Sequence, residues 1–250
     1  LVIGVVVLAF YAYRQLHIAD PLLDLRALGI AAFRTPAIMV SCSFACTLAF
    51  MYLVPQELQR GLGMITLVVS LMLPGGRIVN AVCTLMAGRL FDRHGARVLV
   101  WIGVVMAAIG GALFFAIGVD SGVVLFLAAH IIVMVGIPFI QQSAQSAALK
   151  SLPGRMAADG STILNTMQQV CGAIATAGHL LLGLGQTGYA AGGGTNAAQG
   201  FVDGSRYGYM FGLVLAAIVL VFSFMLKGGK EEPKLVPVRV DGGAVESLAV

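Results

Sequence analysis

Three apolar stretches of the chain each carry polar side chains on one helical face. The polar residues recur at three- and four-residue spacing, which places them on the same side of an α-helix. Stretch by stretch, they are Arg77, Asn80 and Thr84; His130, Gln141 and Gln145; and Asn165, Gln169, Thr176 and His179. Such groups can bind a polar molecule or pass protons, and in hydrocarbon they lack partners. We therefore expect the three faces to line one cavity.

Arg77 is the charge that lies deepest in these stretches. If Arg89 marks the membrane surface, the twelve residues between them place Arg77 at ~18 Å depth, near the middle of a ~30 Å hydrocarbon core. A charge there costs at least about 2.5 kcal/mol, so it should face a cavity or a partner. Arg77 can bind an anionic group of a substrate or pair with a carboxylate from another helix bundle. The alternative is that Arg77 has no function and is a chance substitution, tolerated because water reaches its side chain.

The other polar residues also have structural interpretations. Four of the amide side chains can hydrogen-bond between helices, worth about 0.6 kcal/mol each, as readily as they can contact a substrate. They are Gln141, Gln145, Asn165 and Gln169. His130 and His179 can pack or hydrogen-bond inside the bundle, or they can carry protons. The residues alone leave both questions open.

Enzyme and metal chemistry are not expected. The sequence contains no H-E-x-x-H and no G-x-S-x-G, and its eleven acidic residues fall in predicted loops, the tail or span ends. The four cysteines lie in apolar stretches without a C-x-x-C, which favours small core residues over a disulfide or zinc site. We expect no cofactor and no bound metal. A receptor or structural role would not need three polar faces, although the sequence does not exclude it.

The elements that position these residues must be membrane-spanning helices. The chain is 59% hydrophobic and 10% charged, against about 25% charged residues in a soluble domain. Uncharged stretches long enough to cross hydrocarbon occupy 35–56, 98–119, 121–149, 160–202 and 207–226, and a sixth, 65–88, is interrupted only by Arg77. We predict an all-α membrane protein, with six complete helices in residues 36–226 and the end of a preceding helix in residues 1–16.

The polar and apolar helices follow a repeating order. Spans 98–118 and 207–226 carry no polar face, so every third helix is apolar. This order predicts two three-helix repeats around a cavity, with the apolar helices on the periphery. In the first of them, Gly103, Ala107 and Gly111 form a row of small residues that predicts close helix packing.

Basic residues predict the orientation of the chain. Twelve of them fall in alternate connections and the tail, and two, Arg60 and Arg206, in the others. Because cytoplasmic loops are rich in Lys and Arg, we expect residues 88–97 and the C-terminus in the cytoplasm. The net charge of +4 follows from this topology and does not point to nucleic acid.

The segments outside the spans differ in composition. We predict a cytoplasmic amphipathic linker in residues 17–35, a flexible external loop in the glycine-rich segment 185–205, and a disordered cytoplasmic tail in residues 227–250. The sequence starts inside an apolar run at Leu1, without a basic segment before it, so we expect no signal peptide and a fragment of a longer protein.

The charged segment "GRLFDRHGAR", residues 88–97, joins two spans. Gly88 and Gly95 permit a tight turn, and Asp92 can oppose the positive end of the next helix. Anchoring of the loop in the cytoplasm would by itself explain why it is basic. The order of its residues also resembles the G-x-L-x-D-R-x-G-x-R loop of the major facilitator superfamily, in the copy that lies in the second half of those transporters.

Further stretches resemble the fourteen-helix drug:proton antiporter branch of that family. They are, in family order, "ADPLLDLRAL", "LVPQELQRGLG" with "LPGG", and "LPGRMAADGSTILNTMQQVCGAIATA". The resemblance implies the C-terminal six-helix bundle of a multidrug efflux permease in the bacterial cell membrane. It also implies that Asp92, Arg93 and Arg97 form a charge relay that latches the two halves of the transporter.

The resemblance sets the expected partners as well. They are the lipid bilayer, small amphipathic substrates, protons, and an N-terminal bundle that this sequence lacks. That bundle would hold the family's intramembrane acidic residues, so proton coupling cannot be assigned to a residue here. The alternative within transporters is a carrier of one specific metabolite.

Overall fold

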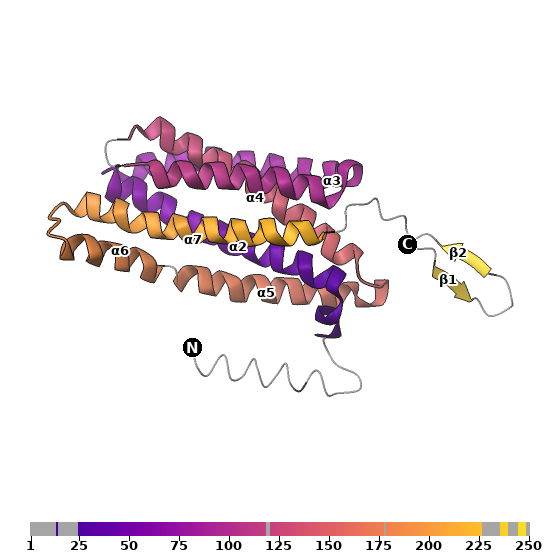
Figure 1. Ribbon diagram of the computed structural model, residues 1–250. Coiled ribbons are helices and arrows are strands. Elements are labelled where there is room, and N and C mark those ends of the chain that lie inside the picture. The colour runs from indigo at the N-terminus through magenta and orange to yellow at the C-terminus, as the bar shows by residue number, and fades with distance from the viewer. Residues whose placement is uncertain are drawn as a thin grey trace.

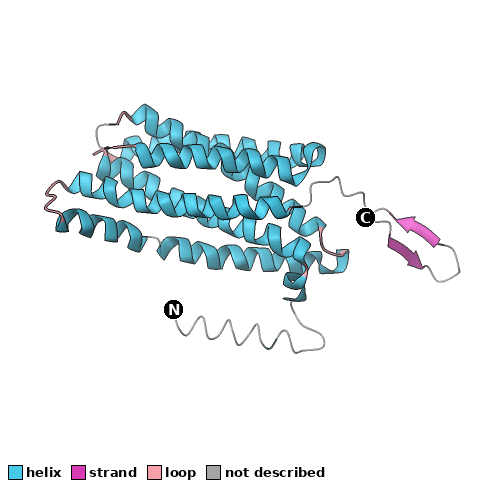
Figure 2. Cartoon of the chain, in the orientation of Figure 1, coloured by secondary structure: helices cyan, strands magenta, loops and turns pink. Residues whose placement is uncertain are grey.

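The computed structural model describes residues 14, 25–118, 121–177, 179–226, 236–239 and 245–248. Helices make up most of these residues, and strands are confined to one hairpin (Figure 2). The elements are η1 (Leu25–Gly29), α2 (Ala31–Gln56), η2 (Glu57–Gly61), α3 (Thr66–Ala116), α4 (Val123–Lys150), η3 (Gly154–Met156), α5 (Ala157–Ala177), α6 (His179–Ala191), α7 (Ala197–Met225), β1 (Val236–Arg239) and β2 (Val245–Leu248). The preceding helix predicted in residues 1–16, apart from Arg14, and the linker up to residue 24 lie outside the described residues.

Among the described residues, four helices are long and apolar enough to cross a membrane. They span Ala31–Gly61, Thr66–Ala116, Val123–Lys150 and Ala197–Met225. The second contains 51 residues, which at 1.5 Å per residue is ~77 Å, more than twice a ~30 Å hydrocarbon core. It therefore holds two spans, and the 65–88 and 98–119 stretches of the sequence account for them.

Gly95 separates the two spans of α3. Its backbone has φ 77° and ψ 169°, a left-handed conformation that a side chain would strain. Cys83 and Ala87 on one side of this break pack with Leu99 on the other, so the two halves run back along each other. Gly88 lies inside the helix, and a methyl group added there would meet nothing within 4 Å. The turn therefore depends on Gly95. The sequence predicted a role for Gly88 as well, and the structure shows none.

The helices pack around α2 (Figure 1). α2 contacts α4 and α5, and α7 packs against α2, α6 and α3. The two spans predicted to be apolar are neighbours: the Trp101 ring meets the Phe224 ring edge to face at 4.9 Å, and Gly111 approaches Leu213. The second half of α3 and α7 thus share one side of the bundle.

The small-residue row of the second half of α3 packs closely on α4. A methyl group on Gly103 would lie 2.6 Å from the Gly136 carbonyl oxygen, and one on Gly136 would lie 2.7 Å from the Gly103 oxygen. Neither backbone could stay in place with a larger residue at the crossing. The close packing predicted from Gly103 and its neighbours is confirmed, with Gly136 as the partner.

The glycine-rich segment 185–205 is mostly helical and not the flexible loop predicted. α6 continues to Ala191, and α7 starts at Ala197 after Asn196, whose side-chain oxygen accepts hydrogen bonds from two backbone N–H groups of the first turn. Only residues 192–196 connect the two helices. The prediction is wrong because a high glycine content is typical of closely packed helices as well as of loops.

The glycines of α7 serve close helix packing. Gly200, Gly204, Gly208 and Gly212 follow one another at four-residue spacing and share one helix face. A methyl group on Gly204 would lie 2.6 Å from the Leu182 carbonyl oxygen of α6, and one on Gly208 would lie 2.5 Å from Leu53 of α2. This row lets α7 approach both neighbours, which positions its side chains against α2.

The segment 227–250 contains a hairpin. β1 and β2 pair antiparallel, with Val236 opposite Leu248 and Arg239 opposite Val245. The sequence predicted a disordered tail here. The residues around the two strands lie outside the described part of the chain, so disorder of the tail as a whole stays a prediction.

Candidate functional site

Two of the predicted cavity residues meet where α3 packs on α4. Asn80 of α3 donates from its side-chain nitrogen to the Met134 carbonyl oxygen of α4 at 3.1 Å. His130 of α4 is 6% exposed, and neither ring nitrogen has a hydrogen-bond partner among the described residues. Its ring fits because residue 76 is glycine: a methyl group there would lie 2.5 Å from Nε2. The imidazole is therefore enclosed, and neither its N–H nor its acceptor nitrogen has a hydrogen-bond partner among the described residues.

Arg77 lies one residue beyond this contact. Its side chain is exposed, although it belongs to a helix long and apolar enough to span a membrane. Because the guanidinium is always charged, it needs water or an anion at this position. The bundle thus presents a cation on its surface beside an enclosed histidine.

The amides of α4 and α5 are less buried than those two residues. Gln141 and Gln145 are half-buried on α4, and Asn165 and Gln169 are exposed on α5. Within the described part of the chain, no hydrogen bond joins these four side chains to another helix. On α5 the buried amide is Gln168, which is 7% exposed. The structure therefore places Asn165 and Gln169, but not Gln141 and Gln145, on the outside of the bundle.

The predicted gate loop carries an ion pair to the end of α4. Lys150 Nζ lies 3.2 Å from Asp92 Oδ1, with both side chains more than half exposed, and 4.5 Å from the centre of the Phe91 ring. Such an exposed pair contributes at most about 1 kcal/mol. Arg93 and Arg97 form no ion pair with Asp92 in the described structure. The relay implied for these three residues stays a prediction.

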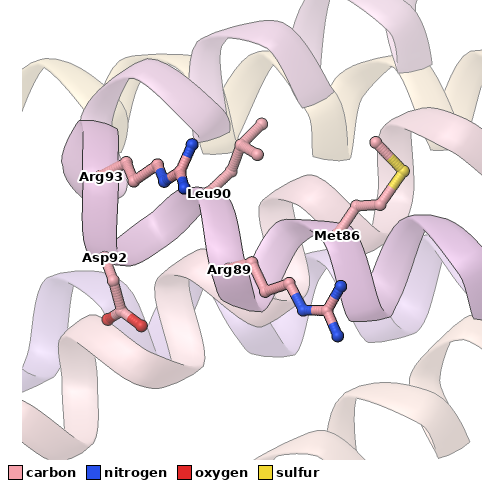
Figure 3. Close-up of a pocket in the computed structure, with 5 residues that line it drawn as sticks. All are labelled: Met86, Arg89, Leu90, Asp92 and Arg93. Carbon is pink, nitrogen blue, oxygen red and sulfur yellow. The ribbon is translucent and has the colours of Figure 1, made fainter.

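A shallow pocket of about 480 Å³ lies beside this loop. Its lining residues are Met86, Arg89, Leu90, Asp92 and Arg93 (Figure 3). The Asp92 carboxylate points away from the Arg93 guanidinium across the helix (Figure 3). Two guanidinium groups at its rim make this end of the bundle positively charged.

One buried acidic residue was missed by the sequence analysis. Glu57 follows α2 in the π-helical turn η2 and is fully buried. The Tyr209 hydroxyl of α7 donates a hydrogen bond to its Oε2, while Oε1 has no partner among the described residues. Its position on the helix could have indicated burial. Glu57 follows the apolar residues Leu53 and Val54 by four and three residues, so it shares their helix face, and both are buried.

Comparison with known proteins identifies the family. A model of the Major Facilitator Superfamily matches residues 1–176, which is more than half of the chain. The chain belongs to the major facilitator superfamily. The predicted family and its all-α membrane fold are thereby confirmed. Together with the apolar helices, this makes the chain a multi-pass bacterial cell-membrane protein of a transporter family.

Several curated relatives in this superfamily are named for drug resistance. The lincomycin resistance protein LmrB of Bacillus subtilis is 33% identical over 233 residues, 91% of this chain and 49% of the relative. LmrB of Listeria monocytogenes is 33% identical over 242 residues, covering 92% and 50%. The multidrug efflux pump LfrA of Mycolicibacterium smegmatis is 22% identical over 175 residues, covering 70% and 35%. The chain spans about half the length of the first two relatives.

Proposed function

We propose that this chain supplies one of the two six-helix bundles of a drug exporter that exchanges its substrate for protons. The substrates would be small amphipathic toxic compounds, lincomycin among them. The proposal is supported by membership of the superfamily and by the resistance names of relatives that the chain matches over 91–92% of its length. A transporter of one specific metabolite is the alternative within the family.

One structural observation carries the proposal: polar side chains stand on the outside of a membrane bundle. Arg77, Asn165 and Gln169 are exposed, and in hydrocarbon each would lose its hydrogen-bond partners at a cost of several kcal/mol. A second bundle facing them across water would remove that cost. Transport would then proceed by rocking of the two bundles about a site near the midplane.

Transport assays test this function directly. Inside-out vesicles that contain the two-bundle protein should accumulate lincomycin when a pH gradient is imposed, and should stop when an ionophore collapses it. Lincomycin accumulation that does not depend on the pH gradient would show that transport is not coupled to protons. Transport of a single metabolite with no drug transported would favour the alternative.

We also propose that the C-terminus and the loop at residues 88–97 lie in the cytoplasm, supported by the twelve-to-two division of basic residues. His94, next to the break of α3 at Gly95, and Thr195, between α6 and α7, are both exposed. The break of α3 and the α6–α7 connection lie at opposite ends of the bundle (Figure 1). In a cysteine-free background, His94→Cys should react with an impermeant thiol reagent only from the cytoplasmic side, and Thr195→Cys only from outside. The reverse pattern would invert the proposed orientation.

A further inference from the structure

Glu57 lies where η2 packs against α7. Its side chain is fully buried, in a π-helical turn that continues α2. The turn lies close to α7, since a methyl group on Gly61 would come within 3.0 Å of Val202 Cγ2. Single π-turns are rare and often mark functional sites. A carboxyl group is thus enclosed between two helices near one end of the bundle.

The hydrogen-bond donor to Glu57 is held rigidly. The Tyr209 ring stacks on Phe114 of α3 with centroids 4.7 Å apart and an interplanar angle of 14°, and lies 5.6 Å from Phe50 of α2. Tyr209 is itself fully buried, and its hydroxyl donates to Glu57 Oε2. Glu57 Oε1 has no partner in the described structure. The site therefore provides one fixed donor and leaves one carboxyl oxygen unsatisfied.

The nearest cation to Glu57 is Arg206 of α7, which interacts with the carboxyl group through space and forms its ion pair with another residue. On α7, Arg206 Nη1 donates to Asp203 Oδ1 at 3.1 Å. On the same turn as Glu57, Arg60 lies over the Phe201 ring at 5.9 Å. Besides Tyr209, the remaining titratable group nearby is Tyr52 of α2, 43% exposed. The facing residues of α3, 66–76, contain no ionisable side chain. No described cation pairs directly with the carboxyl group.

We propose that Glu57 binds and releases the proton that the transporter exchanges for its substrate, with Tyr209 as its positioning residue. A carboxylate ion buried without a direct ion pair and with an unsatisfied oxygen is costly, whereas the neutral acid is tolerated. While η2 is packed on α7 the carboxyl group keeps its proton; when the turn separates from α7 and water enters, the proton leaves. Proton binding and the position of η2 are then reciprocally coupled.

This inference rests on the proposed function, so the test includes a measurement that does not need transport. Infrared difference spectra of the purified two-bundle protein between acid and alkaline buffer should contain the C=O stretch of a protonated carboxyl group. Glu57→Gln should remove that component, and Asp159→Asn, at the start of α5, should leave it. If the Glu57→Gln spectrum retains the full band, Glu57 does not titrate and the inference is wrong.

Transport separates a coupling role from a structural one. Glutamine keeps the shape of Glu57 and still accepts from Tyr209, but it cannot exchange a proton. In proteoliposomes, Glu57→Gln should lower lincomycin uptake driven by a pH gradient at least about tenfold. Exchange of lincomycin without a gradient should change less than about twofold, because it needs no net proton movement. Asp159→Asn should affect neither process, and Tyr209→Phe should shift the pH dependence of uptake.

Two transport outcomes would overturn the inference: gradient-driven uptake preserved in Glu57→Gln, or uptake and exchange lost to the same extent. If the wild-type protein transports no lincomycin but the infrared band depends on Glu57, the substrate proposal fails and the proton-binding site stands.

Discussion

Residues 1–250 inserted alone into inside-out vesicles should give no proton-coupled lincomycin accumulation, whereas the two-bundle protein should accumulate it. Alternating access needs two bundles that rock about a shared site, and under the proposed function this chain provides one wall of that site. The exposed Arg77, Asn165 and Gln169 would then face no partner. The effect is all-or-none, and accumulation of labelled lincomycin under an imposed pH gradient measures it.

The comparison requires equal amounts of both proteins in the membrane, checked by immunoblotting of washed vesicles. Co-expression of the first bundle as a separate chain should restore part of the activity. Accumulation by residues 1–250 alone would mean that copies of this chain assemble into a transporter, which would contradict the one-bundle account.

The second large effect is expected at Arg77. Replacing this exposed cation by leucine should abolish transport or change substrate preference, because the charge at this depth needs water or an anion and no acid of the described bundle pairs with it. Membrane insertion should be unchanged, since leucine is favourable in hydrocarbon. Uptake of lincomycin, a cationic dye and an anionic dye measures the preference.

Two matched variants sharpen the Arg77 test. Arg77→Lys keeps the charge and should retain transport within about tenfold, allowing for the different hydrogen-bond geometry of lysine. Ile78→Leu changes the exposed neighbour without changing charge and should behave as wild type. If Arg77→Leu transports every substrate as the wild type does, Arg77 has no role in transport and the prediction is wrong.

The spans could be predicted because apolar length is a property of the local sequence. The stretches 35–56, 65–88, 98–119, 121–149 and 207–226 each lie mostly in a helix long and apolar enough to span a membrane, and α3 joins the second and third of them through Gly95. The stretch 160–202 is instead divided between α5, α6 and the start of α7. The segment 185–205 could not be read in the same way, since its composition suits both a loop and a close helix contact. The spacing of Gly200, Gly204 and Gly208 decides between them, and that periodicity was available in the sequence.

The partners of the polar residues could not be predicted, because they depend on helices distant in sequence. Glu57 is enclosed by Tyr209, 152 residues away, so the residues around it place it only at the end of a span. Asp92 pairs with Lys150, 58 residues away. Gln168, and not Gln169, is buried on α5, a difference of one residue in helical phase.

The most direct test of the account is whether the exposed amides of α5, Asn165 and Gln169, line a substrate cavity. Asn165 and Ile174 are both exposed, and their separation of nine residues places them on opposite faces of the helix. In a cysteine-free two-bundle protein, Asn165→Cys should react with a water-soluble thiol reagent, and lincomycin should slow that reaction. Ile174→Cys should stay unreactive in lipid. Equal reactivity at the two positions, or an Asn165→Cys that reacts at the same rate with and without transported substrate, would contradict the account.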